Sequence, residues 1–352
     1  MGPEKFRAGV NTYLRRHAWG NATAADLFAA LSEQTEIEVG AAMATHLDQP
    51  GIPHVRADFV DEGSLVLTQE RFRNYGTELE ASADDQVWSI PMMLRYADGE
   101  QVHMQQIVMT EPRQKIELKT DKPLDWLYLN AGESGYYRWS MPPELFVELT
   151  REAPDVLSKT ERTGLVGTIG ALLDAGMIGG DDMLRLVEQL FTDRDPEVLQ
   201  SLLSLVGKAN GAFVTPELEA DFARYVSRVL RPALDRIGWE RQEGEPEAMP
   251  SLRASLIGWL ADDGRDEEAR RLTIELADRY LESPEEVDPT LVGVALRCSA
   301  IDGDRDRYEI YRKRFEAAET PTERRRFLGV LGDFQNEEIA ETALAYTLTG
   351  PI

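Results

Sequence analysis

The chain has 352 residues, 42% apolar and 29% charged, so it is long enough for two or three folded domains, each with its own core. Its 63 acidic residues outnumber the 38 basic ones, and the formal net charge is −25 at pH 7. Because so acidic a surface repels phosphate backbones and anionic lipid, we expect no nucleic acid and no membrane among its partners. The same charge favours cationic peptides, although solubility alone is the commoner reason for it.

The single cysteine, Cys298, excludes an internal disulfide and is typical of a reducing compartment, so we expect a cytoplasmic protein. Cys298 lies in an apolar run with a helical pattern (291–300), which predicts a buried, inert thiol. No apolar run approaches the ~18 residues that a membrane span needs. The first ten residues resemble neither a signal core nor a transit segment.

Residues 1–48 have a helical pattern. In the first helix, apolar side chains recur at three- and four-residue steps on one face: Phe6, Val10, Tyr13 and Leu14. Gly20 interrupts this pattern, and Thr23 is placed to cap a second helix. Because two or three helices make a poor core on their own, we expect this segment to pack against something else.

From residue 49 to 141 the apolar side chains alternate, which predicts about seven short strands in an antiparallel β-sandwich. The expected strands cover 55–59, 65–67, 88–96, 102–109, 116–118, 126–129 and 136–140. Asp98-Gly99 provides the turn between the third and fourth of them. Pro91 lacks an amide donor, so its strand is expected to be an edge or to be bulged at that residue.

Residues 142–352 are predicted to be helical. Four pairs place a capping side chain before a proline, which suits the first position of a helix: Asp195-Pro196, Thr215-Pro216, Asp288-Pro289 and Thr320-Pro321. Gly238, Gly264 and Gly303 follow helices and are expected to be left-handed C-caps. Helix pairs recur every ~35–40 residues, which indicates an irregular HEAT-like α-solenoid. The fold class is therefore α+β and multidomain: a short helical segment, a β-sandwich and an α-solenoid.

Two features of the helical region concern its connections. The segment Arg241–Pro250 is charged and poor in apolar residues, which predicts a loop. The pattern ends near Thr349 without the polar cap that terminal repeats need, so we expect a continuation of an incomplete helical domain.

No constellation of residues predicts catalysis, cofactor binding or metal binding, so no site residue is assigned. The zinc motif H-E-x-x-H is missing, and no two of the four histidines (His17, His46, His54 and His103) lie three or four residues apart. Each histidine is therefore interpreted as a surface or rim residue.

Other motifs have structural interpretations too. Gly132-Glu133-Ser134-Gly135 misses the spacing of a nucleophile elbow and is predicted to be a turn. The glycines of 167–180 lack the Lys-Ser/Thr of a phosphate loop and indicate helix packing. Asp181-Asp182 suits the positive end of a helix dipole and is not interpreted as a metal site. Of Tyr136 and Tyr137, which point to opposite faces of a strand, one is expected in the core and the other under a neighbouring domain.

Four blocks follow one another in the order of a known domain: Gly51-Ile52-Pro53, Gln69-Glu70-Arg71-Phe72, Trp88-Ser89-Ile90-Pro91 and Gly135-Tyr136-Tyr137-Arg138. They resemble the β-sandwich behind the catalytic domain of the aminopeptidase N-like zinc metallopeptidases, the puromycin-sensitive type included. Glu161–Leu165 and Arg228–Trp239 resemble parts of that family's carboxy-terminal helical domain. The order of these strings over three hundred residues argues against coincidence.

The resemblance implies three segments. Residues 1–48 resemble the helical tail of the thermolysin-like catalytic domain, 49–141 the β-sandwich domain, and 142–352 the HEAT-like domain. The family's zinc ligands, its glutamate general base, its amine-binding loop and its oxyanion-stabilising tyrosine belong upstream, and no residue here matches them. The implied zinc therefore belongs to the parent enzyme, and the implied partners are the missing catalytic domain and a peptide substrate.

Two hypotheses follow from this sequence. In the first, the chain is the non-catalytic, carboxy-terminal portion of a zinc aminopeptidase, inactive alone, whose helical domain covers the active site and gates or binds peptide. In the alternative, a free-standing module of solenoid and β-sandwich binds peptides or a partner protein and has no enzymatic activity.

Overall fold

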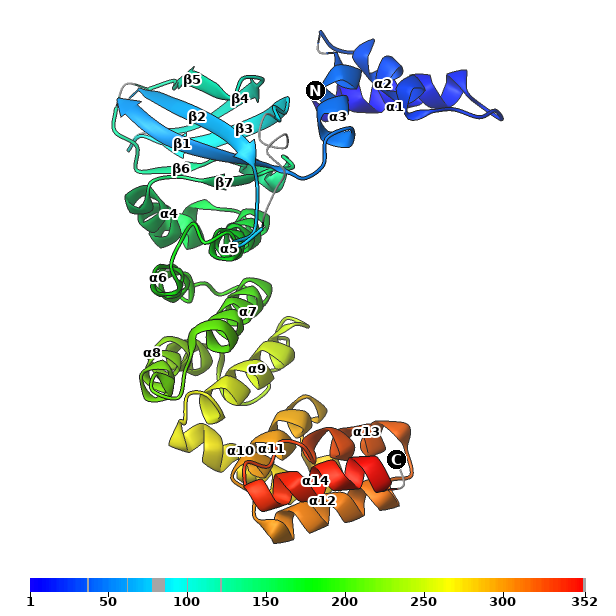
Figure 1. Ribbon diagram of the computed structural model, residues 1–352, viewed down its shortest axis with the longest axis vertical. Coiled ribbons are helices and arrows are strands. Elements are labelled where there is room, and N and C mark those ends of the chain that lie inside the picture. Colours follow the sequence, from blue (N-terminus) through cyan, green and yellow to red (C-terminus); the bar gives the residue numbers. More distant parts are fainter. Residues whose placement is uncertain (37, 62, 78–85, 100, 121, 351–352) are drawn as a thin grey trace. The chain divides into compact units, whose positions relative to one another are not determined.

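The computed structural model describes residues 1–36, 38–61, 63–77, 86–99, 101–120 and 122–350 (Figure 1). Within them the chain is α+β and mostly helical, with two small sheets, which confirms the predicted α+β class. The chain divides into two compact units, residues 1–186 and 187–352, which are described separately. The predicted domain limits at residues 48 and 141 stay predictions.

The first unit begins with α1 (Pro3–Arg16), α2 (Ala24–Ser32) and α3 (Val39–Leu47). Thr23 caps α2 as predicted: its hydroxyl accepts from the Asp26 N–H at 3.4 Å, and the Asp26 carboxylate accepts from the Thr23 N–H at 2.8 Å. The predicted apolar face of α1 is only partly covered, since Phe6 and Leu14 are both more than half exposed. These helices therefore leave apolar surface open, as expected of a segment that packs against something else.

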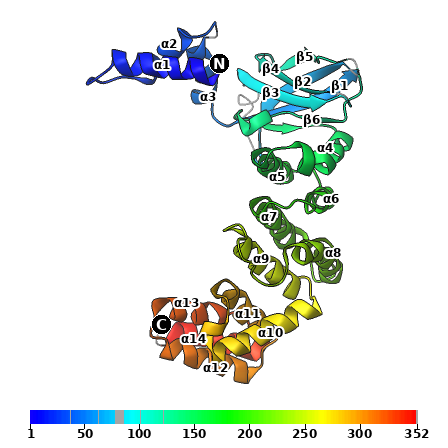
Figure 2. The same cartoon turned by 180° about the vertical axis from the view of Figure 1, so that it is seen from behind.

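Seven strands among the described residues form two sheets. The larger has the order β5-β2-β1-β7, and the smaller has β3 between β4 and β6 (Figure 2). The strands are β1 (Pro53–Asp61), β2 (Ser64–Arg71), β3 (Ile90–Ala97), β4 (Val102–Met109), β5 (Arg113–Glu117), β6 (Trp126–Tyr128) and β7 (Arg138–Ser140). Alternating apolar side chains are fully buried on both sheets, as the predicted two-residue period requires: Val55, Ala57, Leu65, Leu67, Ile90 and Leu94.

The prediction of purely antiparallel pairing is wrong at one pair of strands. β1 and β7 are parallel, with Val55 opposite Trp139, whereas the other paired strands are antiparallel. Parallel neighbours need a long crossover connection. The chain between β1 and β7, which contains the other five strands, provides it.

Of the two local predictions for β3, the turn is confirmed, but the edge or bulged strand is not, because β3 is the central strand of its sheet and pairs with β4 without a bulge at Pro91. Pro91 pairs with Val108 of β4, while β6 pairs only with residues 95–97, so Pro91 lies in a part of β3 with a described neighbour on one side. At the other end, Gly99 has φ +84° and the Asp98 N–H donates to the Gln101 carbonyl at 3.2 Å. This is the predicted turn between β3 and β4.

The helices after β7 are α4 (Pro143–Val156), α5 (Lys159–Asp174), α6 (Gly180–Leu190), α7 (Pro196–Phe213), α8 (Glu219–Ile237), α9 (Met249–Ala261), α10 (Glu267–Glu282), α11 (Pro289–Ile301), α12 (Arg305–Ala317), α13 (Pro321–Val330) and α14 (Glu337–Thr349). Two short 3₁₀ turns are η2 (Ala131–Glu133) and η3 (Pro284–Glu286). In the first unit, α4 packs on β6, and α5 packs on β7 and η2.

Three of the four predicted caps are confirmed. Asp195, Asp288 and Thr320 each accept a hydrogen bond from a backbone N–H in the first turn of α7, α11 and α13. The prediction for Thr215 is wrong, because α8 begins at Glu219. Residues 215–218 instead form a turn in which the Leu218 N–H donates to the Thr215 carbonyl at 2.8 Å.

The prediction of left-handed C-caps is wrong for all three glycines. Gly238 follows α8 with φ +83° but ψ 155°, outside the left-handed helical region, and Gly264 and Gly303 do not have positive φ; after α9 the residue with positive φ is Arg265. The reason for glycine at Gly303 is space. An added Cβ would lie 2.6 Å from Cε1 of Phe334 and 2.9 Å from the Ser299 carbonyl oxygen.

In the second unit, α7 packs on α9, α9 on α11 and α11 on α13. The sequential pairs α8–α9, α9–α10, α10–α11 and α12–α13 also pack together. The predicted loop at 241–250 is confirmed as far as Ala248, since α9 begins at Met249. Among the described helices of both units, none combines the length and the apolar character that crossing a membrane requires.

Candidate functional site

The motifs that carry the family resemblance contact one another. The Gln69 side chain accepts from the Trp88 N–H at 2.8 Å and donates to the Trp88 carbonyl at 3.0 Å, which joins β2 to the segment before β3. The Phe72 N–H donates to the Ile52 carbonyl at 2.9 Å. Gly51 has φ +97°, and an added Cβ would lie 2.5 Å from Nε of Arg71. These motif residues therefore hold strands together.

The segment between β6 and β7 is fixed by the fourth motif. The Asn130 Oδ1 accepts from the Gly135 N–H at 2.8 Å, and the buried Tyr137 hydroxyl donates to the Leu129 carbonyl at 2.5 Å. The prediction that one tyrosine lies in the core is confirmed by Tyr137, while Tyr136 is 72% exposed. In the described part of the chain nothing covers Tyr136, so its burial under a neighbouring domain stays a prediction.

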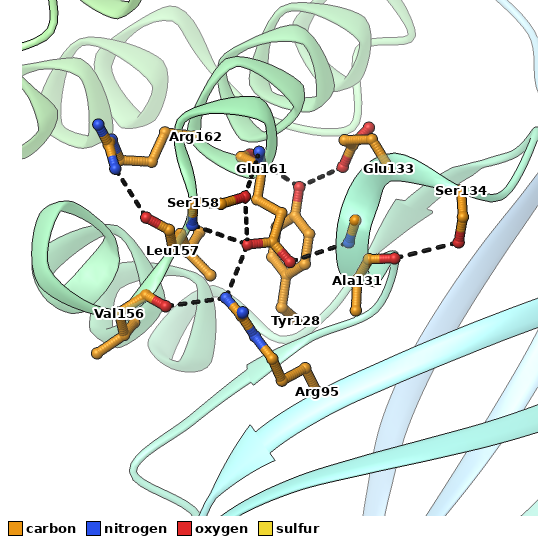
Figure 3. Close-up of polar contacts among 11 residues, drawn as sticks. Arg95, Tyr128, Ala131, Glu133, Ser134, Val156, Leu157, Ser158, Glu161 and Arg162 are labelled. Carbon is orange, nitrogen blue, oxygen red and sulfur yellow. Dashed lines mark hydrogen bonds and ion pairs between the residues drawn. The ribbon is translucent and has the colours of Figure 1, made fainter.

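Glu161 joins the strands of the first unit to α5 (Figure 3). Its side chain is 2% exposed. One carboxylate oxygen accepts from the Arg95 guanidinium, the Ser158 N–H and the Ser158 hydroxyl, each at 2.8 Å. The other accepts from the Gly132 N–H at 2.9 Å. The same side chain therefore completes the cap of α5, neutralises Arg95 and holds η2.

A second carboxylate lies next to this group. The Tyr128 hydroxyl donates to Glu133 and also contacts the Glu161 carbonyl oxygen, at 2.9 Å (Figure 3). Burial raises the pKa of Glu133, and the charge of Glu161 adds to the effect. For Glu161, burial alone would raise the pKa, but the hydrogen bonds from Gly132 and Ser158 and the charge of Arg95 outweigh it and hold this pKa below its usual value.

We call this arrangement the Glu161 junction; its residues are Arg95, Tyr128, Gly132, Glu133, Ser158 and Glu161. Its contacts have a structural role. Every oxygen of the Glu161 carboxylate is occupied by donors of the chain itself. An added Cβ at Gly164 would lie 2.1 Å from Cδ of Glu133, so the backbone of α5 lies close to the Glu133 side chain. The junction thus fixes α5 on the strands.

The prediction that His54 is a surface or rim residue is wrong, since it is 2% exposed. Its Nδ1 lies 3.2 Å from Glu70 and its Nε2 lies 2.9 Å from the Ser140 hydroxyl. This has the connectivity of a serine–histidine–carboxylate triad, and here the imidazole joins β1 to β2 and β7. Sequence analysis missed the burial of His54 because β1 is an inner strand, paired with β2 and β7. The sequence does not show which strands lie inside a sheet.

The other histidines are partly exposed. His103 contacts Asp98 at 2.9 Å, and His46 contacts the Ser89 carbonyl at 3.1 Å. His17 lies 4.0 Å from the Asp26 carboxylate. Over the residues that the structure covers, no three His, Cys, Asp or Glu side chains form a group able to hold a metal ion.

The remaining motifs have local roles. The Ser134 hydroxyl donates to the Ala131 carbonyl at 3.1 Å within the predicted turn. Asp181 and Asp182 occupy the first turn of α6, as predicted, and both bind Arg185 of the same helix. Cys298 is buried as predicted, and burial raises the pKa of its thiol to about 12, which makes it unreactive.

The described residues thus form two sheets followed by a long run of helices, with the resemblance motifs used for packing. The family model of the ERAP1-like C-terminal domain matches residues 126–352, so the chain belongs to that family.

Similar proteins point to the same group of enzymes. The chain is 26% identical over 321 residues to "Aminopeptidase 2" of Candida albicans, covering 89% of this chain and 34% of that protein. It is 26% identical over 375 residues to "Aminopeptidase M1" of Arabidopsis thaliana (100% and 41%) and 26% identical over 297 residues to "Aminopeptidase N" of Lactobacillus delbrueckii subsp. lactis (82% and 34%). The chain thus spans between 34% and 41% of the length of these relatives. These matches confirm the resemblance to the carboxy-terminal portion of an aminopeptidase N-like enzyme.

The packing role of the fourth motif gives a first testable prediction. An added Cβ at Gly135 would lie 2.1 Å from Cε1 of Tyr137 and 3.0 Å from Oδ1 of Asn130. Because the Tyr137 ring is buried and cannot move away, Gly135→Ala is expected to lower the free energy of unfolding by about 1–3 kcal/mol. Urea unfolding measures this change.

Gly167→Ala is the matched control. Gly167 lies in α5, and an added Cβ there would meet no heavy atom within 4 Å. This substitution is expected to raise the free energy of unfolding by about 0.5–1 kcal/mol, because alanine favours the helix over glycine. Equal effects of the two substitutions would contradict the packing role of Gly135.

Proposed function

We propose that this chain is the carboxy-terminal, non-catalytic portion of a zinc aminopeptidase that removes amino-terminal residues from peptides. The match of the ERAP1-like C-terminal domain family to residues 126–352 carries this proposal, together with relatives named as aminopeptidases. In the proposal the zinc and the catalytic residues belong to the catalytic domain of the parent enzyme, which is the main partner, and peptide is the substrate. We also propose a cytoplasmic location, for which the use of a single buried cysteine argues.

The proposal assigns a role to each segment. Residues 1–48 form the helical tail of the catalytic domain, 49–141 a β-sandwich whose two sheets pack face to face, and 142–352 a HEAT-like solenoid. The buried alternating side chains of both sheets support the sandwich. The row of odd-numbered helices in the second unit supports the solenoid. The solenoid covers the active site and gates or binds the peptide.

Exposed apolar side chains on the first helices support the catalytic domain as a partner. Trp19 is 107% exposed, and four further apolar side chains of this segment are at least 36% exposed. These four are Phe6, Leu14, Met43 and Leu47. Apolar side chains gathered on three short helices are typical of a surface that another part of a protein covers.

Zinc analysis and a peptidase assay test the proposal. The purified chain is expected to contain no stoichiometric zinc and to leave an alanyl chromogenic amide intact. Co-expression with a polypeptide that carries the H-E-x-x-H domain is expected to give a stable complex with turnover. Stoichiometric zinc and turnover in the chain alone would overturn the proposal.

The alternative, a free-standing interaction module without enzymatic activity, predicts different results. It predicts no complex with a catalytic polypeptide, and a ribosome-binding site directly before the codon for Met1. An in-frame upstream coding stretch with H-E-x-x-H favours the aminopeptidase instead. The two functions are therefore separated by reading the upstream DNA and by the co-expression experiment.

A further inference from the structure

A cavity of about 550 Å³ lies in the second unit, lined by α9, α11 and the carboxyl end of α7. Trp259 forms part of its wall, and its indole rests on α7, where an added Cβ at Gly207 would lie 3.4 Å from Cζ2 of Trp259. Gly258 allows α11 to approach α9, since an added Cβ would lie 2.8 Å from Cγ2 of Val294. The cavity therefore results from close helix packing, which fixes the positions of its lining side chains.

The ionisable side chains that line this cavity include more carboxylates than basic groups. Asp262 accepts from Arg297 at 2.8 Å, and Arg297 also lies 3.9 Å from Asp333. Asp263 accepts from the neutral amide of Asn210 at 2.6 Å, and over the described ranges no ion pair joins Asp263 to a basic side chain. Burial raises the pKa of Asp263 and the charge of Asp262 adds to it. The charge of Arg297 opposes this pKa shift. The lining thus contains two carboxylates, Asp262 and Asp263, and one basic side chain, Arg297, which pairs with Asp262.

We propose that this cavity binds the guanidinium or ammonium group of an arginine or lysine side chain in a peptide. Asp263 accepts a charge-assisted hydrogen bond from that group, and Trp259 in the wall supplies an aromatic ring, a group that attracts cations. The inference rests on the proposed function, because it names the class of peptide residue that the helical domain prefers.

Other occupants fit the lining less well. An anion would face two lining carboxylates, Asp262 and Asp263, against the single guanidinium of Arg297, which already pairs with Asp262. An apolar side chain would displace water from Asp263 and Asn210 without replacing its hydrogen bonds, which costs binding free energy. The net charge of −25 also concentrates cations at the surface of this chain.

Fluorine NMR of the full chain labelled with 5-fluorotryptophan tests the inference. The sequence has six tryptophans, and Trp259→Phe assigns the resonance of Trp259. The probes are capped pentapeptides, with arginine, lysine or norleucine between pairs of glycines, and spermidine. The arginine and lysine peptides are expected to shift the Trp259 resonance and to bind on the order of tenfold more tightly than the norleucine peptide.

Two variants locate the effect. Asp263→Asn keeps the size of the side chain and removes its charge, and is expected to reduce the preference for arginine over norleucine to less than about twofold. Glu286→Gln removes one charge from an exposed residue of η3, outside the cavity lining, and is expected to keep the full preference. Thermal unfolding of both variants checks that they fold.

Each outcome decides the inference. Equal binding of arginine and norleucine peptides to the original chain overturns it, whether or not Asp263→Asn folds, and so does an undiminished preference in a folded Asp263→Asn. A shift of the Trp259 resonance by spermidine but not by the peptides also overturns it, in favour of a free polyamine. Because binding is measured without turnover, a chain that forms an active complex but shows no preference refutes this inference and leaves the proposed function intact.

Discussion

Replacing Glu161 by alanine is expected to lower the free energy of unfolding of the first unit by about 3–5 kcal/mol. The substitution leaves the largely buried Arg95 guanidinium without its carboxylate. It also removes the acceptor of the Gly132 and Ser158 N–H groups. A buried donor that loses its partner costs more than the bond itself contributes. Denaturant unfolding followed by near-ultraviolet circular dichroism of the buried aromatic residues measures the change.

Glu148→Ala is the control for this prediction. Glu148 pairs with Arg151 on α4, where both side chains are about half exposed. Removing an exposed pair of this kind is expected to change the free energy of unfolding by about 0–1 kcal/mol. If Glu161→Ala cost no more than Glu148→Ala, the Glu161 junction would not be the connection between the strands and α5.

The junction also has a pH dependence with a defined sign. The pKa of Glu161 is lowered in the folded chain, so its stabilising contribution is fully present above the pKa of the unfolded chain, near 4.5. It is lost as the pH falls through the lower, folded pKa. The difference in unfolding free energy between the original chain and Glu161→Gln should therefore shrink on acidification. Glu133 titrates with the opposite sign, and the charge of Glu161 contributes to its raised pKa, so the comparison is made with Glu133→Gln present in both proteins.

Local rules of sequence predicted much of this fold. A capping side chain before proline correctly predicted the starts of α7, α11 and α13, because such a cap acts within a single turn of helix. Thr215 satisfies the same rule, yet α8 begins at Glu219. At that point the preceding residues close a separate turn, and the pattern of residues alone does not distinguish the two outcomes.

Features that depend on distant parts of the chain were less predictable. The parallel pairing of β1 with β7 brings together residues such as Val55 and Trp139, and no local pattern specifies which strand becomes the neighbour of β1. The burial of His54 was also unpredictable, because it depends on the position of β1 between β2 and β7. Gly303 was predicted from its position after a helix, whereas its close contact with Phe334 depends on a later segment of the chain.

The Glu161 junction was recognisable only in part. Its sequence motif, with Ser158 three residues before Glu161, has the spacing of a capping box. The ion pair with Arg95 and the bond from Gly132 join residues that are distant in sequence, and a single sequence contains no sign of them. The resemblance to a family identified the motifs; their mutual contacts required the structure.

The second unit has a comparable buried charge, and Arg253→Met is expected to destabilise it by about 3–5 kcal/mol. Arg253 is 2% exposed and pairs with Glu245 of the loop before α9, whose side chain is 8% exposed. Its Nε also donates to the Gly238 carbonyl at 2.8 Å, at the end of α8. The substitution therefore removes the buried cation of a largely buried carboxylate, leaving only the exposed Arg241 at 4.0 Å, and it leaves a helix end without its donor.

Arg241→Met is the matched control, because Arg241 lies 4.0 Å from the same carboxylate but is 66% exposed. Its removal is expected to change the free energy of unfolding by no more than about 0.5 kcal/mol. A double-mutant cycle of Arg253→Met with Glu245→Gln should give a coupling free energy of about 1–3 kcal/mol, measured by urea unfolding. Additive effects would mean that Arg253 stabilises α9 through its packing and its bond to α8, and that the charged loop is bound only weakly.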